Sequence, residues 1–422
     1  MSRVTRTSDR AGWSELHRND PGAYFALRDD PPQEFVEEMR RRFEIDSELD
    51  RQLVRKLEQR GNGAYQHIGL DEFVACFESM LEASIGSGFE VTNACWFAGG
   101  ASKIQLGCDL TWTDPVRGRV TDDLVVRMDP AESLNATSRR QEGEVLTAVS
   151  GHLPVPRVLW LDEEARWFLQ PALVYTRMAG VAKPELTDSG AVSGLGTNFG
   201  PDLRRPLGEQ FVSHLAALHT LEVGSLELPS FDKPAVDTVD APRWKLNQYR
   251  RVWEEDRSED FRLVDAAASW LGRNLPTVDR VSLLHGDYRS GNFLFDEQDA
   301  RITAWLDWEY THLGDRHRDL AWVTDATFGH TDPETGMYLV SGLFTEEDFL
   351  ARYEEASGLP VDRNRLHYYK VANTHQLLVA TLATATRISF LGKTHQNVLL
   401  AWVRGMTPVL SQQLLRLLTV EE

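Results

Sequence analysis

The sequence has few cysteines, with three in 422 residues and no pair in the CxxC spacing of metal or redox sites. Cys76, Cys95 and Cys108 form an odd set, so the pattern favours neither a disulfide framework nor a cysteine-ligated zinc site. A protein of this kind suits a reducing compartment. We therefore expect a cytoplasmic location.

Long apolar runs are also missing. The longest apolar stretches, such as residues 398–403, are far shorter than the roughly 20 residues that a membrane-spanning helix needs. The first residues, MSRVTRTSDRAGW, contain no apolar segment of the kind found in a secretory signal. We expect no membrane partner and no signal peptide.

Positive charge is scarcer than negative charge, because 45 Lys and Arg stand against 64 Asp and Glu, giving a net charge of −19. This balance argues against nonspecific binding to nucleic acid, so we expect no nucleic-acid partner. It is compatible with a cationic substrate, but it is equally ordinary in soluble enzymes. Hydrophobic residues at 42% and charged residues at 26% are typical of a globular protein, and the length allows two or three domains.

Three regions differ in their hydrophobic patterning. Residues 1–85 carry apolar side chains at helical intervals and form an expected N-terminal extension. Residues 86–178 contain short β-branched runs around one helical segment at 137–150, which predicts a small antiparallel sheet with a helix packed on it. Helical periodicity dominates in residues 179–422, where Phe211, Leu215 and Leu218 lie on one predicted helix face.

The segment 283–322 carries the most specific chemical pattern. Asp287 follows an apolar strand in the tripeptide HGD, where its carboxylate could accept a proton from a hydroxyl group. Asn292 comes five residues later, and its amide oxygen suits a hard cation such as Mg²⁺. Asp307 ends the apolar run ITAWLD and offers a carboxylate to the same cation.

Two short strands, 293–295 and 302–306, are predicted to pair around the turn at 296–301. That hairpin would bring Asn292 and Asp307 side by side. A single Asp or Asn in a loop is more often a turn residue than a ligand. The combination of a base and two metal ligands, each in its own place, instead predicts phosphoryl transfer.

The stretch from HGDYRSGNFLF to LDWEYTHLGD resembles the signature of the aminoglycoside phosphotransferase and choline kinase group. It is most similar to the phosphotransferase domains associated with acyl-CoA dehydrogenases, and the resemblance runs from about residue 90 to the C-terminus. It implies an α+β, bilobal, protein kinase-like fold with a small antiparallel-sheet N-lobe and a larger, mainly helical C-lobe. It also implies an ATP- and Mg²⁺-dependent kinase that phosphorylates a hydroxyl group of a small molecule.

The resemblance assigns a role to each residue of the motif. Asp287 would be the catalytic base, with Asn292 and Asp307 as Mg²⁺ ligands. His285 would brace the loop, and Arg289 would contact a phosphate unless it is a solvent-facing loop residue.

Two further residues of the segment receive supporting roles. Asp319 resembles the residue that caps the catalytic loop from a following helix. Trp308, next to Asp307, is expected to line the floor of the cleft.

The resemblance places the nucleotide on the N-terminal side of the motif. The run FAGGASKIQL resembles the phosphate-covering loop, with Gly99, Gly100 and Ser102 as contacts, although two adjacent glycines alone are a weak signal. Arg127 stands where kinases carry a strand lysine, and Glu142 would be its ion-pair partner. A surface role for Glu142 remains the alternative, because Glu144 lies close by.

The strand at 172–180 would lead into the connection between the lobes. Adenine would bind to the backbone near Thr176 and Met178, so the identity of these side chains says little about the contact.

The acceptor stays open at this point. A cationic aminoglycoside would need an acidic cleft, whereas a hydroxyacyl-CoA would need basic residues, for which Arg243, Lys245, Arg250 and Arg251 are candidates unless they form a solvated helix face. The resemblance leans away from a dedicated antibiotic-resistance enzyme. Two other classes are weighed: a catalytically silent nucleotide-binding protein and a metal-dependent hydrolase. The sequence leaves the oligomeric state and the preference for ATP over GTP open.

Overall fold

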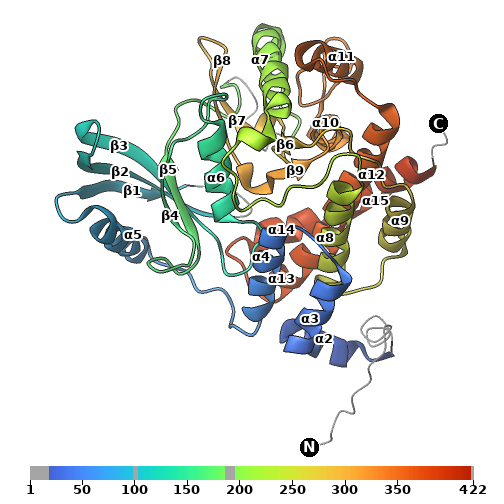
Figure 1. Cartoon of the computed structure of the whole chain (residues 1–422), viewed down its shortest axis with the longest axis horizontal. Helices are drawn as coiled ribbons and strands as arrows, with labels where there is room; N and C mark the ends of the chain where they lie inside the picture. The colour runs from blue at the N-terminus through green and yellow to red at the C-terminus, as the bar shows by residue number, and fades with distance from the viewer. Residues whose placement is uncertain (1–18, 98–102, 186–194, 420–422) are drawn as a thin grey trace, which may run out of the picture.

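The protein, described by a computed structural model over residues 19–97, 103–185 and 195–419, has two lobes joined after a small sheet (Figure 1). The elements up to the end of the sheet are α2 (Pro21–Asp29), α3 (Gln33–Arg42), α4 (Ser47–Glu58), α5 (Leu70–Ile85), β1 (Glu90–Trp96), β2 (Ile104–Asp114), β3 (Gly118–Met128), α6 (Arg139–Val149), β4 (Val158–Asp162) and β5 (Ala172–Thr176).

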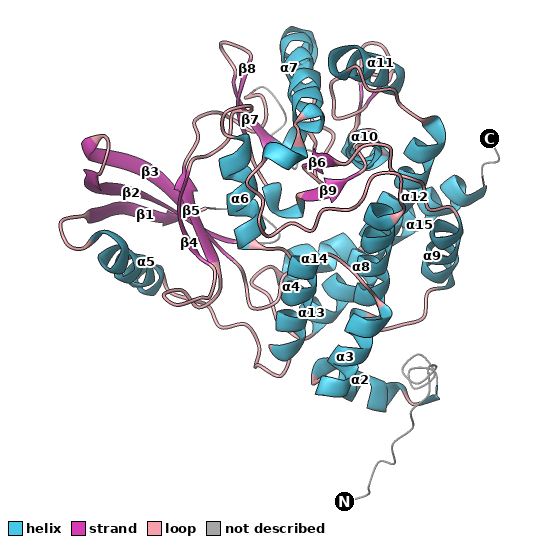
Figure 2. Cartoon of the chain, in the orientation of Figure 1, coloured by secondary structure: helices cyan, strands magenta, loops and turns pink. Residues whose placement is uncertain are grey.

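The N-lobe is an antiparallel sheet in the order β1-β2-β3-β5-β4, covered by a helix on each face (Figure 2). Successive residues of a strand point to opposite faces. Leu124 and Val126 accordingly join the core under α5, whereas Val125 joins the core that contains α6. Arg127 lies two residues after Val125, so it faces the same side as α6.

The C-lobe is mainly helical. Its elements are α7 (Gly200–Thr220), α8 (Asp240–Asp256), α9 (Arg262–Arg273), β6 (Ser282–Leu284), β7 (Phe293–Asp296), β8 (Arg301–Trp305), β9 (His312–Gly314), α10 (His317–Val323), β10 (His330–Thr331), β11 (Tyr338–Leu339), α11 (Glu346–Ser357), α12 (Arg363–Val379), a π-helical segment (Ala380–Ala385), α13 (Thr386–Phe390), α14 (Asn397–Arg404) and α15 (Thr407–Thr419).

Two short antiparallel pairs position the chemical segment. Strand β6 pairs with β9, and β7 pairs with β8 through Phe293 and Trp305. The 293–306 hairpin predicted from the sequence is therefore present. The loop at residues 285–292, called the catalytic loop after the predicted role of Asp287, lies between β6 and β7, so both of its ends are fixed by strand pairing.

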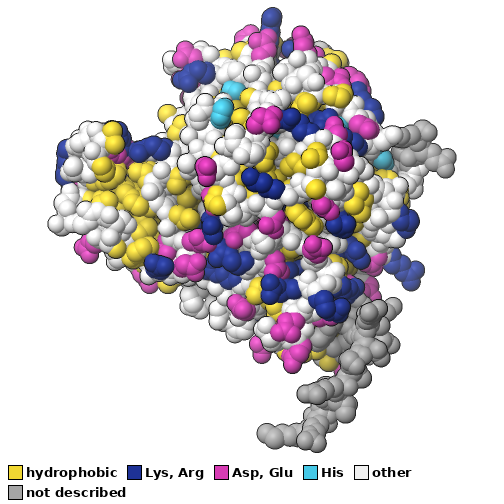
Figure 3. Space-filling view, in the orientation of Figure 1, with side chains coloured by type: hydrophobic (Ala, Val, Ile, Leu, Met, Phe, Trp, Pro, Cys, Tyr) yellow, Lys and Arg dark blue, Asp and Glu magenta, His cyan; other side chains and the backbone are white. Residues whose placement is uncertain are grey.

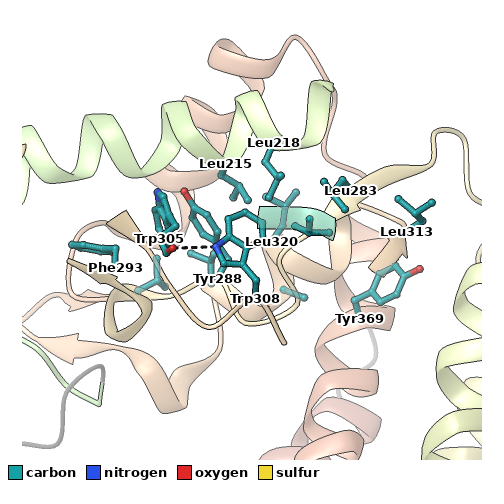
Figure 4. Close-up of a cluster of buried hydrophobic side chains, with 14 of the residues drawn as sticks. Leu215, Leu218, Leu283, Tyr288, Phe293, Trp305, Trp308, Leu313, Leu320 and Tyr369 are labelled. Carbon is teal, nitrogen blue, oxygen red and sulfur yellow. Dashed lines mark hydrogen bonds between the residues drawn. The ribbon is translucent and has the colours of Figure 1, made fainter. Parts of the chain in front are cut away.

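Large aromatic residues fill the core beneath this loop. Tyr288 and Trp305 stack with ring centroids 4.0 Å apart, and the predicted helix face of α7 supplies Leu215 and Leu218 (Figure 4). Trp308, which was expected to line the cleft floor, is 1% exposed, and its indole nitrogen donates to the Trp305 carbonyl at 3.1 Å. This expectation was wrong, because the turn after Asp307 directs the indole into the core.

The N-terminal helices split between the lobes. Helix α5 shares an apolar core with the sheet through Phe73, Phe77 and Met80. Figure 3 shows hydrophobic side chains at the surface between this helix and the sheet. Lys56 and Arg60 instead reach Asp256 of α8. Acidic and basic side chains are interspersed over the part of the surface where α3 and α4 lie (Figure 3). The division at residues 85 and 178 stays a prediction.

The fold class predicted from the sequence is confirmed: a bilobal α+β protein with a small antiparallel sheet and a mainly helical second lobe. In the part of the chain that the structure describes, no helix combines the length and apolar character that crossing a membrane requires.

Candidate active site

One buried carboxylate, Asp319, fixes the start of the catalytic loop by hydrogen bonds. Asp319 of α10 accepts the backbone N–H groups of His285 at 2.8 Å and Gly286 at 2.9 Å, and it lies 3.3 Å from His219 Nε2. Burial alone would raise the pKa of Asp319, but the hydrogen bond and charge of His219 lower it below its ordinary value. The loop-capping contact predicted for Asp319 is therefore present.

In the HGD tripeptide, only glycine fits at position 286. Its φ is +80°, and a Cβ there would lie 2.3 Å from the carbonyl oxygen of Tyr310. Any side chain would push the loop away from the segment that follows Asp307. The glycine of the HGD tripeptide therefore allows the two chemical segments to approach each other.

His285 is held as a neutral ring. Its Nε2 lies 3.0 Å from the Leu306 carbonyl, which can only accept, so Nε2 carries the proton. Its Nδ1 then accepts the backbone N–H of Asp287 at 3.3 Å. Burial lowers the pKa of His285 to about 4, consistent with this arrangement. The side chain ties the catalytic loop to the end of the β7–β8 hairpin.

The Asp287 carboxylate receives three side-chain donors. Arg289 Nε lies 2.9 Å and Trp322 Nε1 2.6 Å from Oδ1, while Asn292 Nδ2 lies 2.6 Å from Oδ2. The guanidinium of Arg289 also lies over the Phe328 ring at 5.2 Å. Arg289 is therefore engaged with Asp287 itself. Its expected phosphate contact stays a prediction.

Asn292 and Asp307 are adjacent, as the hairpin requires. The backbone N–H of Leu306 donates to the Asn292 carbonyl at 2.8 Å, and Asp307 is the next residue. Asn292 uses its amide nitrogen to contact Asp287, so the amide oxygen lies on the other arm of the group. Asp307 adopts a left-handed backbone conformation with φ at 64°. Two residues whose side chains carry oxygen atoms of the type that Mg²⁺ prefers therefore lie side by side in the backbone, and their role as ligands stays a prediction.

Arg127 joins the two lobes. Its guanidinium lies 2.7 Å from Glu142 Oε1, 2.5 Å from Asp307 Oδ1 and 3.0 Å from Glu309 Oε2. Burial alone would lower the pKa of Arg127, but these carboxylates raise it well above its ordinary value. Glu142 is 1% exposed, so it is not a surface residue. The expected Arg127–Glu142 pair is present, and its role in nucleotide binding stays a prediction.

Several residues of this ionic network were not singled out from the sequence. Glu309 Oε2 also lies 3.2 Å from Lys103 Nζ and 3.4 Å from an Arg139 guanidinium nitrogen. Glu309 belongs to the LDWE run, so the motif itself was an available signal. Trp322, one of the three donors to Asp287, was not singled out either, although it lies in the DLAW run. Lys103 lies in the FAGGASKIQL run, but no pattern in the sequence indicated its contact with Glu309.

The segments predicted to bind nucleotide lie partly outside the described residues. Gly99, Gly100 and Ser102 lie outside the described residues. The neighbouring Phe97 ring covers Gly107, where a Cβ would come within 2.5 Å of it.

The expected connection between the lobes begins directly after β5. Thr176 accepts the backbone N–H of Arg157 at 2.9 Å, and its hydroxyl lies 3.9 Å from the sulfur of Met178. Arg177, between them, places its guanidinium 4.9 Å from the centre of the Phe97 ring. The end of β1 and the segment after β5 therefore meet at one side of the sheet.

The four basic residues considered for an anionic acceptor do not act as one group. Arg243 pairs with Asp240 at 2.5 Å, and Arg251 pairs with Asp50 and Glu255. Burial lowers the pKa of Lys245 to about 7. Arg250 lines a separate cavity of about 360 Å³.

Two solved structures share this fold. One is a Ralstonia eutropha protein provisionally named an aminoglycoside phosphotransferase, with a TM-score of 0.59, 18% identity, and coverage of 83% of this chain and 99% of that one. The other is an ethanolamine kinase of Plasmodium vivax, with a TM-score of 0.52, 13% identity, and coverage of 87% and 97%. At these identities the likeness shows the fold alone.

Curated relatives match part of the chain. Acyl-CoA dehydrogenase family member 10 of Mus musculus is 26% identical over 202 residues, which is 47% of this chain and 18% of that protein. Acyl-CoA dehydrogenase family member 11 of Gallus gallus is 33% identical over 122 residues, 28% of this chain and 15% of that protein. The matched region thus spans less than a fifth of either relative.

The family model described as "Phosphotransferase enzyme family" matches residues 112–368. This match contains α6, the catalytic loop and the β7–β8 hairpin. Because it covers more than half of the chain, the protein belongs to the phosphotransferase enzyme family.

Proposed function

We propose that this protein is an ATP- and Mg²⁺-dependent small-molecule kinase, with Asp287 as base and Asn292 and Asp307 as Mg²⁺ ligands. The observation that carries the proposal is that Asp287 and Asn292 are hydrogen-bonded, while Asp307 lies beside Asn292 in the backbone and contacts Arg127. Asn292 donates to Asp287 at 2.6 Å, and Asp307 contacts Arg127 at 2.5 Å. Family membership supports the coarser statement that the protein is a small-molecule phosphotransferase.

Asp287 would act on the acceptor hydroxyl. Its carboxylate accepts the hydroxyl proton as the oxygen bonds to the γ-phosphorus, and the bond between that phosphorus and the bridging oxygen of ADP breaks. Trp322 and Arg289 orient the carboxylate through hydrogen bonds to Oδ1. Most of the catalysis in such a site comes from positioning and electrostatic stabilisation.

The residues present fit a Mg²⁺ ion. When bound, Mg²⁺ neutralises charge on the phosphate oxygens. Asn292 would offer its amide oxygen, because its amide nitrogen is the atom that contacts Asp287. Asp307 is 31% exposed at its side chain, so its carboxylate can be reached from solvent. One amide and one carboxylate, completed by water and phosphate oxygens, form an ordinary Mg²⁺ ligand set.

The N-lobe would hold the nucleotide. Arg127 can bind phosphate oxygens in bidentate fashion, and Glu142 fixes its orientation. Phe97, lying over Gly107 and beside Arg177, offers an aromatic face near the proposed adenine contacts at Thr176 and Met178. Gly99, Gly100 and Ser102 remain proposed phosphate contacts.

The specific acceptor has two candidates, a hydroxyacyl-CoA and an aminoglycoside-type antibiotic. The names of the curated relatives favour an acceptor from acyl-CoA chemistry. The ion pairs of Arg243 and Arg251 remove two of the four basic residues that a CoA phosphate could have used. Lys245 and Arg250 remain for that role.

A transfer screen with ATP and Mg²⁺ over hydroxylated metabolites, acyl-CoAs and aminoglycosides tests the activity. We expect one acceptor class to yield a phosphomonoester together with ADP. A thermal-shift titration with ATP and Mg²⁺ accompanies the screen. Stabilisation by ATP without transfer to any acceptor would favour a catalytically silent nucleotide-binding protein.

A further inference from the structure

Helix α4 of the N-terminal extension is anchored to the C-lobe along its length. Asp50 Oδ1 lies 2.5 Å from a guanidinium nitrogen of Arg251, and Lys56 Nζ lies 2.7 Å from Asp256 Oδ2. Both partners belong to α8, and Lys56 and Asp256 are buried. Buried, paired charges hold their geometry closely, because separating them leaves a charge without compensation. The helix is therefore fixed relative to the C-lobe.

The first turn of α4 also touches the start of α6. Ser138 Oγ donates to Glu48 Oε1 at 2.5 Å, and both residues are buried, with 4% and 6% exposure. Ser138 Oγ also accepts the backbone N–H of Gln141 at 3.2 Å, and this contact caps the N-terminus of α6. A serine hydroxyl has one hydrogen, so its donor goes to α4 while a lone pair caps α6.

Two more contacts follow the same junction. Gln141 Nε2 lies 3.4 Å from Asp46 Oδ1, the residue that caps α4. Leu53 of α4 belongs to the same apolar core as Val145 and Val149 of α6. Helix α4 lies next to one end of α6 in Figure 1. These contacts join α6 to an element that is itself held by the C-lobe.

The position of α6 matters because Glu142 lies one turn beyond Ser138. Glu142 holds Arg127 at 2.7 Å, and Arg127 reaches Asp307 at 2.5 Å. A rotation or shift of the first turn of α6 would change where the guanidinium points. Misplacing a charged group by about 1 Å in such a site can be costly.

We propose that α4 is a strut that sets the position of α6, and that Glu48 is a positioning residue for phosphoryl transfer. Glu48 acts through Ser138 on the Glu142–Arg127 pair and does not touch substrate. This inference rests on the proposed function for its effect on ATP, whereas its effect on α6 is independent of it. It gives the N-terminal extension a role in the site itself.

Glu48 also stabilises its own helix, since Arg51 and Gln52 both contact its carboxylate at 2.9 Å. A loss of stability in a Glu48 variant alone would not separate the two roles. Ser138 does separate them. Ser138→Thr keeps both hydrogen bonds, whereas Ser138→Asp keeps the helix cap and sets a second carboxylate against Glu48.

The test uses the full chain and a non-hydrolysable ATP analogue with Mg²⁺, titrated by calorimetry. Glu48→Ala and Ser138→Asp should weaken binding about tenfold, the equivalent of one charged hydrogen bond. Ser138→Thr should bind as the wild type does. Glu58→Ala, which removes an exposed glutamate of the same helix, is the matched control.

Amide hydrogen exchange on the same variants reads α6 directly. Glu48→Ala and Ser138→Asp should speed exchange in residues 139–149 and leave α5 unchanged. The strut is overturned if both variants keep wild-type exchange in α6 and wild-type affinity. If the wild type fails to bind the analogue, the proposed function fails, and unchanged exchange in α6 would still refute the strut. If Glu48→Ala does not fold, the comparison of Ser138→Asp with Ser138→Thr decides.

Discussion

The two lobes hold their parts of the candidate site with different interactions. On the N-lobe side, Arg127 is held by ion pairs with Glu142, Asp307 and Glu309. On the C-lobe side, the loop before Asp287 is held by backbone N–H groups bound to Asp319 and by a neutral His285. Ion pairs can be redistributed when a charged ligand enters, whereas backbone hydrogen bonds fix a shape in advance. We infer that the N-lobe side accommodates a charged ligand, whereas the C-lobe side fixes the geometry of the loop.

The largest expected effect is on turnover at the C-lobe side. Asp287→Asn removes the proton acceptor but keeps the size of the side chain, so the transfer rate should fall by about a thousandfold. Calorimetry with the ATP analogue should give nearly wild-type affinity. Asp299→Asn, at an exposed position in the turn of the β7–β8 hairpin, is the control. Transfer at the wild-type rate in Asp287→Asn would refute its role as base.

Asp319→Ala tests whether geometry is fixed by the buried carboxylate. The substitution leaves the N–H groups of His285 and Gly286 without their acceptor in a buried loop. We expect the free energy of unfolding to fall by about 3 kcal/mol. Urea denaturation measures this loss. A change below about 0.5 kcal/mol, the usual range for surface substitutions, would show that the loop does not depend on Asp319.

The neutral state of His285 predicts a pH dependence. Its pKa is lowered to about 4 from an ordinary value of 6.5, so the unfolded state binds more protons between these values. Stability should therefore decrease as pH falls from 6.5 towards 4, with this residue contributing about 3 kcal/mol at most. Denaturation of the wild type and His285→Asn over this range should show a shallower dependence in the variant. Parallel curves would contradict the assignment.

The N-lobe side should respond in affinity. Arg127→Lys keeps the charge but loses the planar fork that contacts several carboxylates at once. We expect the affinity for the ATP analogue to fall about tenfold. Arg205→Lys, at an exposed position on α7, is a neutral control. Unchanged affinity would remove Arg127 from the proposed nucleotide site.

The smallest effect is expected at Arg289. Its Nε is one of three side-chain donors to Asp287, and Trp322 and Asn292 remain when it is removed. Arg289→Ala should lower the transfer rate by about threefold to tenfold, the loss expected for one hydrogen bond among several. A hundredfold loss, measured in the same transfer assay, would instead point to the direct phosphate contact that the family resemblance suggests.

The sequence was most informative where one motif is continuous. The short strands at 293–295 and 302–306, with the turn between them, predicted a hairpin that the structure contains, because strand pairing follows local patterning. The pair formed by Arg127 and Glu142 could also be anticipated, but only through the resemblance to a known family.

Contacts between distant segments could not be read in this way. Lys103 and Glu309 are 3.2 Å apart in space, and Glu48 reaches Ser138, yet local periodicity encodes neither contact. Trp308 was misassigned because its place in the sequence, next to Asp307, does not reveal the turn that buries it. Side-chain direction after a left-handed residue depends on the surrounding packing.

The most direct test of the account follows phosphorus itself. A single-turnover reaction with ATP, Mg²⁺ and the acceptor found in the screen is monitored by ³¹P NMR in the wild type and in Asp287→Asn. We predict that the wild type converts the γ-phosphate resonance into a phosphomonoester resonance as ADP appears, and that Asp287→Asn binds ATP but forms almost none. Equal formation of the phosphomonoester by both proteins would contradict the account.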